Sequence, residues 1–200
     1  MKEKNMALEM LRKLINEQVI IYRRTNIVKS EKFSEIMQRT VNRYLNGMIT
    51  NEEVIDELLK LARQIVDAHN EGEKLGLNAE ELAFYDALTQ PEHIKDFYTH
   101  EALIELTKEL TDALRKNKSI DWQKRESARA KMRMMIKKLL KKHKYPPEGM
   151  EYAVKTVMAQ CELWTDYQDM EDDNAVSMQS YTTDNNVQWS MAAENSENYR

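Results

Sequence analysis

The sequence has few of the residues that shape β-rich or disulfide-bonded proteins. Its 200 residues include one cysteine, four glycines and three prolines. A single cysteine excludes an internal disulfide framework and a cysteine-rich zinc site, and so little glycine and proline argues against a turn-rich β-sandwich or barrel. No apolar run is long enough to span a membrane, and the charged start Met1-Lys-Glu-Lys4 does not lead into the apolar core of a signal peptide. These absences predict a soluble, cytoplasmic and mostly helical protein.

Sequence motifs for nucleotide and metal chemistry are missing as well. The glycines stand far apart and form no phosphate-binding loop. His100 and Glu101 begin a metalloprotease-like pattern, but Ile104 stands where its second histidine should be. The acidic run at 169–173 lacks the glycine and the closing glutamate of a calcium loop, where Ser180 stands instead. We therefore expect no catalytic, cofactor-binding or metal-binding residues in this chain.

Apolar residues recur every three or four positions along most of the chain, which is the pattern of amphipathic α-helices. Capping-box sequences mark two helix starts, at Thr50 to Glu53 and at Asn78 to Glu81. The prolines that follow Tyr145 must interrupt a helix. The pattern predicts an all-α bundle of about seven helices, near 5–25, 30–46, 50–72, 78–90, 101–114, 121–143 and 147–164.

The helical pattern fades after Trp164. Residues 161–200 contain nine acidic side chains against Arg200 and are rich in Ser, Asn, Asp and Gln. A segment with so little apolar surface and so much charge of one sign cannot build a core. We therefore predict a helical domain at 1–164 and an acidic, mostly disordered tail at 165–200.

Positive charge is concentrated before the prolines. Residues 115–144 carry thirteen basic side chains against Asp121 and Glu126, a balance of +11. On a helical projection of 125–143, the apolar residues share one sector and six cations cover the opposite side. The six candidate contact residues are Lys131, Arg133, Lys137, Lys138, Lys141 and Lys142.

This basic face has a functional and a structural interpretation. Lysine and arginine bind the phosphates of duplex DNA with salt-dependent affinity, and they also suit an acidic protein surface. Alternatively the face is simply solvated, or it is neutralised by the acidic tail of the same chain. Aromatic residues do not interleave the cations, so stacking on single-stranded nucleic acid is not indicated.

Arg125 and Arg129 project onto the apolar sector of the same helix. A buried guanidinium needs a partner, because taking the ion out of water costs several kcal/mol. We expect one or both arginines to form structural ion pairs with an acid on another helix, with Asp86 or Glu81 as the partner. Alternatively, their guanidinium groups extend to the rim of the helix.

Three stretches of sequence occur in an order that is typical of a known family. They are Ser30-Glu-Lys-Phe-Ser34, Leu75-Gly-Leu-Asn78 followed by Glu81-Leu-Ala-Phe-Tyr-Asp-Ala-Leu88, and Ile120-Asp-Trp-Gln-Lys-Arg-Glu-Ser-Ala-Arg-Ala-Lys131, which continues from Ile136 to Pro147. Over residues 5–163 the chain closely resembles the C-terminal helical region of the R subunit of type I restriction enzymes. The acidic tail has no counterpart in this resemblance.

The resemblance implies a role in assembly within a restriction–modification system. A full R subunit carries a nuclease domain and two motor domains, and uses ATP and Mg²⁺ to translocate duplex DNA and cleave it away from the recognition site. Its last helical part is implied to dock this machinery onto the methyltransferase core of M and S subunits. The nuclease and motor motifs are missing from these 200 residues. We therefore expect a non-catalytic docking domain, either cut from a longer subunit or encoded separately. The alternative is a duplex-DNA-binding module that uses the basic face of 121–143.

Overall fold

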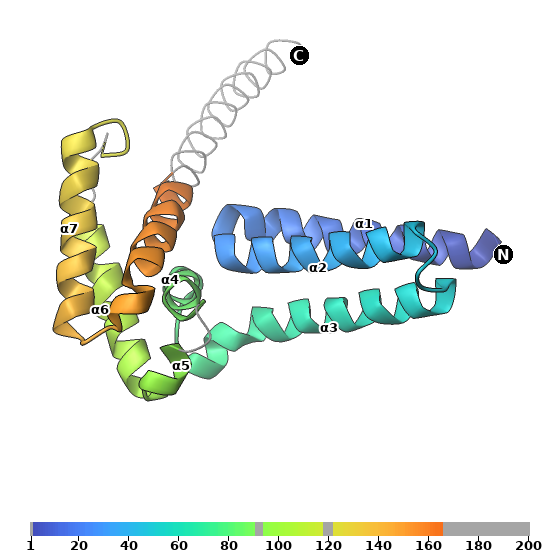
Figure 1. Cartoon of the computed structure of the whole chain (residues 1–200), viewed down its shortest axis with the longest axis horizontal. Coiled ribbons are helices and arrows are strands. Elements are labelled where there is room, and N and C mark those ends of the chain that lie inside the picture. The colour runs from blue at the N-terminus through green and yellow to red at the C-terminus, as the bar shows by residue number, and fades with distance from the viewer. Residues whose placement is uncertain (1, 91–93, 118–121, 166–200) are drawn as a thin grey trace, which may run out of the picture. The chain divides into compact units, whose positions relative to one another are not determined.

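A computed structural model describes residues 2–90, 94–117 and 122–165. The regular structure in these ranges is entirely helical, which confirms the predicted all-α class. A helical segment at 147–165 follows the labelled helices of Figure 1, which are α1 (Lys2–Thr25), α2 (Ile27–Leu45), α3 (Asn51–Leu75), α4 (Ala79–Thr89), α5 (Ile94–Phe97), α6 (His100–Asn117) and α7 (Glu126–Lys142). The chain divides into residues 1–164 and 165–200. Beyond Thr165, the predicted tail lies outside the described residues.

Two helices begin where the sequence supplies a capping box. Thr50 caps α3 and Asn78 caps α4, each accepting a hydrogen bond from the backbone N–H three residues on. The glutamates at those positions accept in return from the backbone N–H groups of Thr50 (2.7 Å) and Asn78 (2.9 Å). Two donors that a helix start would leave unpaired are thus satisfied in each case. Both predicted capping boxes are confirmed.

Two helix boundaries differ from the prediction. The start of α2 is set by Asn26 rather than Ser30, because the Asn26 side chain accepts a hydrogen bond from the backbone N–H of Lys29 (3.1 Å). The predicted end of α3 at residue 72 is also wrong, because the helix continues for three more residues, to Leu75. Gly72 is buried, and a Cβ there would lie 3.0 Å from the backbone oxygen of Leu77. This glycine therefore serves close packing inside the helix and does not end it.

Of the helices that follow α4, one was not predicted, one begins later than predicted, and one begins where it was predicted. The single turn α5 was missed, because four residues are too few to show a helical period. α7 begins at Glu126 and not near Asp121, and Trp122 lies buried in the turn that precedes it. The segment 147–165 begins at Pro147 as predicted, since proline fits the first turn of a helix.

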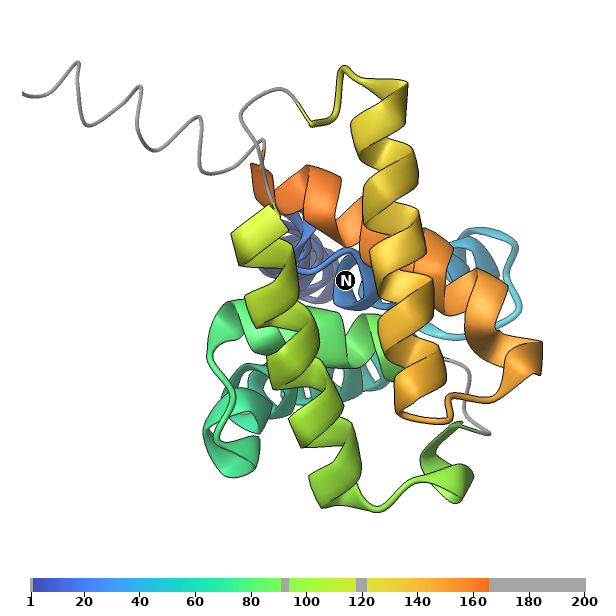
Figure 2. The same ribbon diagram turned by 90° about the vertical axis from the view of Figure 1, so that its left-hand side faces the viewer.

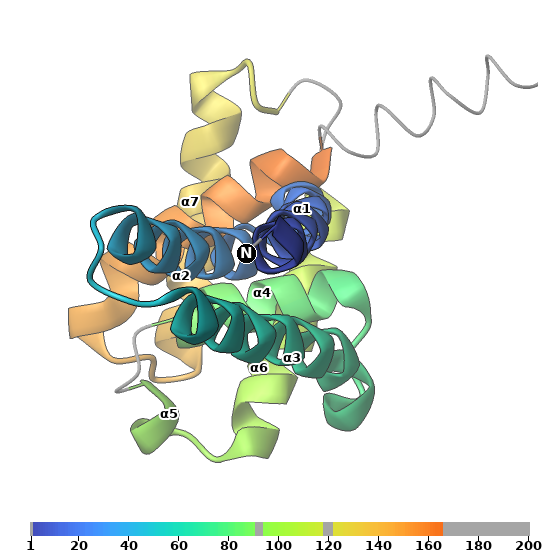
Figure 3. The same cartoon turned by 90° about the vertical axis from the view of Figure 1, so that its right-hand side faces the viewer.

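The first hydrophobic core lies among α1, α2 and α3. Ile15 and Val19 of α1, Phe33 of α2, and Val54 and Leu58 of α3 are buried there. Figure 3 shows the three helices nearly end-on, with α1 and α2 side by side above α3. Burial of one apolar stripe from each helix makes α1–α3 a three-helix unit.

The second hydrophobic core lies among α4, α6, α7 and the segment 147–165. Leu88, Leu106, Leu110 and Ile136 are fully buried in it, and Cys161 is one of its small buried side chains. Figure 2 shows α6 and α7 side by side in front of the segment 147–165. This packing turns the apolar side of α7 inward and therefore its basic side outward.

A buried polar junction links the two cores. Lys29 of α2 donates hydrogen bonds to the carbonyl oxygen of Ala68 and to Glu71 of α3 (both 3.0 Å), and its Nζ lies 3.4 Å from Oδ2 of Asp86 on α4. Asn26 also donates to Asp86 (2.6 Å). Burial raises the pKa of the Asp86 carboxyl, although Lys29 and Asn26 act in the opposite direction. The name polar junction is used below for Asn26, Lys29, Glu71 and Asp86.

Candidate interaction surface

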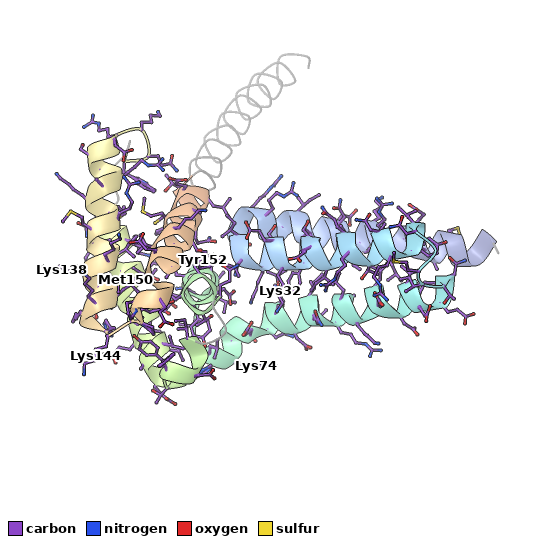
Figure 4. The ribbon with its side chains drawn as sticks, viewed as in Figure 1. Lys32, Lys74, Lys138, Lys144, Met150 and Tyr152 are labelled. Atoms are coloured by element: carbon purple, nitrogen blue, oxygen red, sulfur yellow. The ribbon has the colours of Figure 1, made fainter. Side chains whose placement is uncertain are left out.

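α7 separates apolar and basic side chains onto two sides of one helix. Met132, Ile136, Leu139 and Leu140 are buried against the second core. The six predicted contact residues lie on the exposed side or along its edges. Figure 4 shows Lys138 on the side of α7 that faces away from the segment 147–165. Periodicity placed these cations correctly because an α-helix repeats every 3.6 residues whatever packs against it.

Two of the six cations are paired with acids of neighbouring helices. Lys137 Nζ lies 2.6 Å from Glu151 of the segment 147–165, and Lys142 Nζ lies 2.5 Å from Glu109 of α6. Nε2 of His143 lies 2.7 Å from the other carboxylate oxygen of Glu109. Hydrogen bonds from Lys142 and His143 hold the pKa of the Glu109 carboxyl below its usual value. The positive field of α7 is therefore weaker along these edges than the sequence count suggests.

The arginines of α7 differ in their surroundings. Arg129 Nη2 lies 2.9 Å from Oε1 of Glu162, which belongs to the segment 147–165. Arg133 pairs with Glu126 two turns earlier on the same helix. Arg125 is exposed at the start of α7, and no ion pair joins it to another residue in the described part of the chain.

The partners predicted for Arg129 were wrong. Asp86 belongs to the polar junction, and Glu81 belongs to the capping box of α4. The partner is Glu162 because α7 and the segment 147–165 run antiparallel. The antiparallel arrangement follows from the order of the contacts, in which Lys137 meets residue 151 and Arg129 meets residue 162. Helical spacing carries no information about that arrangement.

Three lysines of α7 keep their charge unpaired. Lys131, Lys138 and Lys141 are exposed, and no acidic partner for them exists among the residues that the structure describes. Together with Met134, which is 73% exposed, they follow one side of the helix over about 15 Å at about 1.5 Å per residue. These four residues are called the outer stripe. They form a continuous cationic surface that no acid of the described residues neutralises.

A hollow of about 320 Å³ lies next to the first turns of α7. Arg125 and Lys131 line it, together with Ser127 of α7 and Asn117 of α6. Two unpaired cations at one hollow attract an anionic group such as a phosphate or a carboxylate. The hollow therefore extends the outer stripe toward the start of the helix.

A larger cleft of about 1030 Å³ lies among α2, α3, α4 and α5. Lys29, Glu71 and Asp86 of the polar junction form part of its wall, and Figure 4 labels Lys32 and Lys74, two other residues that line it. Its lining combines three lysines with four acidic residues. Because the charges of both signs nearly balance, this cleft does not select an anionic partner as the outer stripe does.

Two absences hold for the described residues. No group of three or more His, Cys, Asp or Glu side chains in them is arranged to hold a metal ion. None of their helices is both long and apolar enough to cross a membrane.

The chain is similar in sequence to subunits of type I restriction enzymes. Residues 1–166 match a family model described as "Type I restriction enzyme HindI endonuclease subunit-like, C-terminal". The type I restriction enzyme HindI endonuclease subunit of Haemophilus influenzae is 37% identical over 159 residues, which are 80% of this chain and 15% of that protein. The putative type I restriction enzyme MjaIXP endonuclease subunit of Methanocaldococcus jannaschii is 33% identical over 141 residues, which are 70% of this chain and 13% of that protein. No solved structure matches the chain.

The extent of these matches confirms the resemblance that the sequence strings indicated. The family model covers all seven labelled helices and the described segment 147–165. The chain itself spans less than a sixth of the length of either relative. The chain belongs to the family of C-terminal domains of HindI-like type I restriction endonuclease subunits.

Proposed function

We propose that this chain is a non-catalytic assembly domain of a type I restriction endonuclease subunit. It docks the ATP-dependent DNA translocase and nuclease onto the methyltransferase core of M and S subunits, in defence against foreign DNA. Membership of the family of C-terminal domains carries this proposal. The chain corresponds to only 15% and 13% of its relatives' length, and ATP and Mg²⁺ would act in the remainder of such a subunit.

The exposed surface of the domain supports a docking role. The outer stripe combines three unpaired lysines with an exposed methionine, and methionine is enriched in protein interfaces because its flexible side chain adapts to a partner. Unpaired lysines favour encounter with an acidic protein face. Such a surface suits a complex with another protein of the same assembly.

Binding to the M–S core is the direct test. The purified chain is mixed at low salt with the M–S methyltransferase from the same source, and the complex is measured by size-exclusion chromatography with light scattering. We expect a stable complex that weakens as salt rises, since exposed charges are screened. Absence of a complex at low salt would refute the docking role.

A second function, binding of duplex DNA, is favoured by the unpaired charge of the outer stripe. Three lysine–phosphate contacts predict that log K falls against log salt with a slope of about −2.7. Fluorescence anisotropy with duplexes of unrelated sequence measures this slope. The variant Lys131→Glu/Lys138→Glu/Lys141→Glu should then bind all duplexes much more weakly.

A matched control separates contact from net charge. Lys60, Arg63 and Lys108 are exposed cations on other helices, and their reversal to glutamate changes the net charge by the same amount. We expect that control to retain most of the DNA affinity. Equal losses in the two triple variants, or an affinity that ignores salt, would remove DNA binding by the outer stripe.

A further inference from the structure

Gln160 joins the two ends of the turn between α1 and α2. It belongs to the segment 147–165 and is only 2% exposed. Its Nε2 donates a hydrogen bond to the carbonyl oxygen of Thr25, and its Oε1 accepts one from the backbone N–H of Ile27, both at 2.9 Å. Thr25 ends α1 and Ile27 begins α2, so neither backbone group has a partner within its own helix. One buried carboxamide therefore satisfies both groups.

The residue type at position 160 matters, because the turn presents one acceptor and one donor. A carboxamide supplies a donor and an acceptor side by side. A carboxylate would place a negative oxygen against the carbonyl oxygen of Thr25, and an apolar side chain would leave both backbone groups without a partner. Between them, Asn26 donates a hydrogen bond to Asp86 of α4 (2.6 Å). The turn 25–27 is thus held by two elements of the second core.

The three-helix unit has an apolar core of its own. The buried residues of the first and second cores form two separate clusters, and the chain passes from α3 to α4 through the short turn 76–78, where Gly76 has a φ of 63°. Parts with separate cores move relative to one another unless their interface is large and apolar. At this boundary Val28 and Leu75 pack against the second core, and Gln160 and the polar junction add buried polar contacts. Residues 1–164 thereby form one compact unit.

We propose that Gln160 is a latch between the two parts of the domain. While both its hydrogen bonds hold, the three-helix unit stays fixed against the second core. When they break, the unit pivots about residues 76–78 and both cores stay packed. Water replaces Gln160 at Thr25 and Ile27 in the open state, so opening costs only the difference between protein and water hydrogen bonds at these groups. Such an open state is a minor population of the native protein.

The large cleft among α2, α3, α4 and α5 lies across the same boundary. Lys32 and Phe33 line it from the three-helix unit, and Thr89 and Asp96 line it from the elements that follow the turn 76–78. A pivot about this turn changes the width of the cleft. The latch therefore controls how open the cleft is, and it does so independently of the proposed docking function.

A variant whose latch responds to pH tests this proposal. Gln160→Glu replaces the amide by a carboxyl group of the same shape, and burial beside a carbonyl oxygen raises the pKa of that carboxyl. At about pH 5 the carboxyl is neutral, donates to Thr25 and accepts from Ile27, as glutamine does. At about pH 8 it is ionised and repels the carbonyl oxygen, so we expect the open population to rise about ten-fold. Gln160→Met makes neither hydrogen bond and should be open at both pH values.

Double electron–electron resonance measures the opening as a distance. Spin labels are placed at Lys60→Cys on α3 and Lys108→Cys on α6, two exposed positions, in a chain whose buried Cys161 is replaced by alanine. We expect one narrow distance for the parent chain at both pH values, and a second distance for Gln160→Glu at the higher pH only. Gln38→Glu adds the same charge at an exposed position of α2. This matched control should behave like the parent chain.

Hydrogen exchange checks that both cores stay packed. Amides of α3 near Leu58 and of α6 near Leu110 should keep the protection of the parent chain in Gln160→Glu, because each side chain is fully buried within one core. The parent chain at each pH also accounts for titration of Asp86, whose pKa is raised by burial. An unchanged distance at the higher pH, a second distance that persists at the lower pH, or loss of protection in either core would overturn the proposal.

Discussion

Replacing Lys29 with methionine removes the cation of the polar junction and keeps its apolar stem. The Lys29 side chain is only 7% exposed, and without it Asp86 keeps one described partner, Asn26 at 2.6 Å. Removing one partner of a buried ion pair costs about 3–5 kcal/mol, because the remaining charge stays out of water. Glu71 is 40% exposed and is resolvated, so its lost pairing adds little. We expect Lys29→Met to lower the free energy of unfolding by about 3 kcal/mol at neutral pH.

The loss depends on pH through Asp86. Burial raises the pKa of this carboxyl, and Lys29 opposes that rise, so the variant raises the pKa further. An acid with a higher pKa in the folded state binds more protons there than in the unfolded state. Its protonation then contributes stability below the unfolded pKa of about 3.9, and this contribution is lost as pH rises through the folded-state pKa. The deficit of Lys29→Met should therefore be full near neutral pH and small near pH 4.

Urea unfolding followed by circular dichroism measures this deficit at both pH values. The double variant Lys29→Met/Asp86→Leu removes both charges and should recover most of the stability. Lys32→Met, at an exposed lysine one turn away, is the matched control and should stay within about 0.5 kcal/mol of the parent chain. A deficit below about 1 kcal/mol at neutral pH, or one that does not change with pH, would refute the argument that a desolvated carboxylate remains.

Urea unfolding also tests three local features, each with its own limit. Asn78→Ala removes the cap of α4 and should cost about 1 kcal/mol; a neutral change would show that the capping box does not stabilise that helix. Gly76→Ala places a Cβ on the left-handed residue that ends α3 (φ 63°) with nothing within 4 Å, so the cost should be only the backbone strain of about 1–2 kcal/mol; a gain would contradict that conformation. Leu110→Ala opens a cavity in the second core, where Leu110 is fully buried, and should cost about 2.7–5 kcal/mol; less than about 1 kcal/mol would mean that the core collapses around the gap.

The candidate surface on α7 was predictable in part. Helical periodicity identified the outward side, because the apolar positions 132, 136, 139 and 140 had to face a core. The same periodicity could not distinguish, among the six cations, those that form ion pairs from those that do not. Only Lys131, Lys138 and Lys141 lack partners among the described residues, since the acids that pair with Lys137 and Lys142 stand 14 and 33 residues away in the chain. No local pattern specifies pairs at such separations.

Sequence patterns of a few residues were enough for the helical class, both capping boxes and the family. Each of these depends on neighbours three or four positions apart, or on short strings read in order. Contacts between residues far apart in the sequence could be found only from the packing of the helices. It placed Asp86 beside Lys29 and Glu162 beside Arg129, and it covered one apolar side of α1 while leaving the other exposed. The amino-acid pattern of α1 shows that both sides are apolar, but only contacts between distant segments decide which of them is buried.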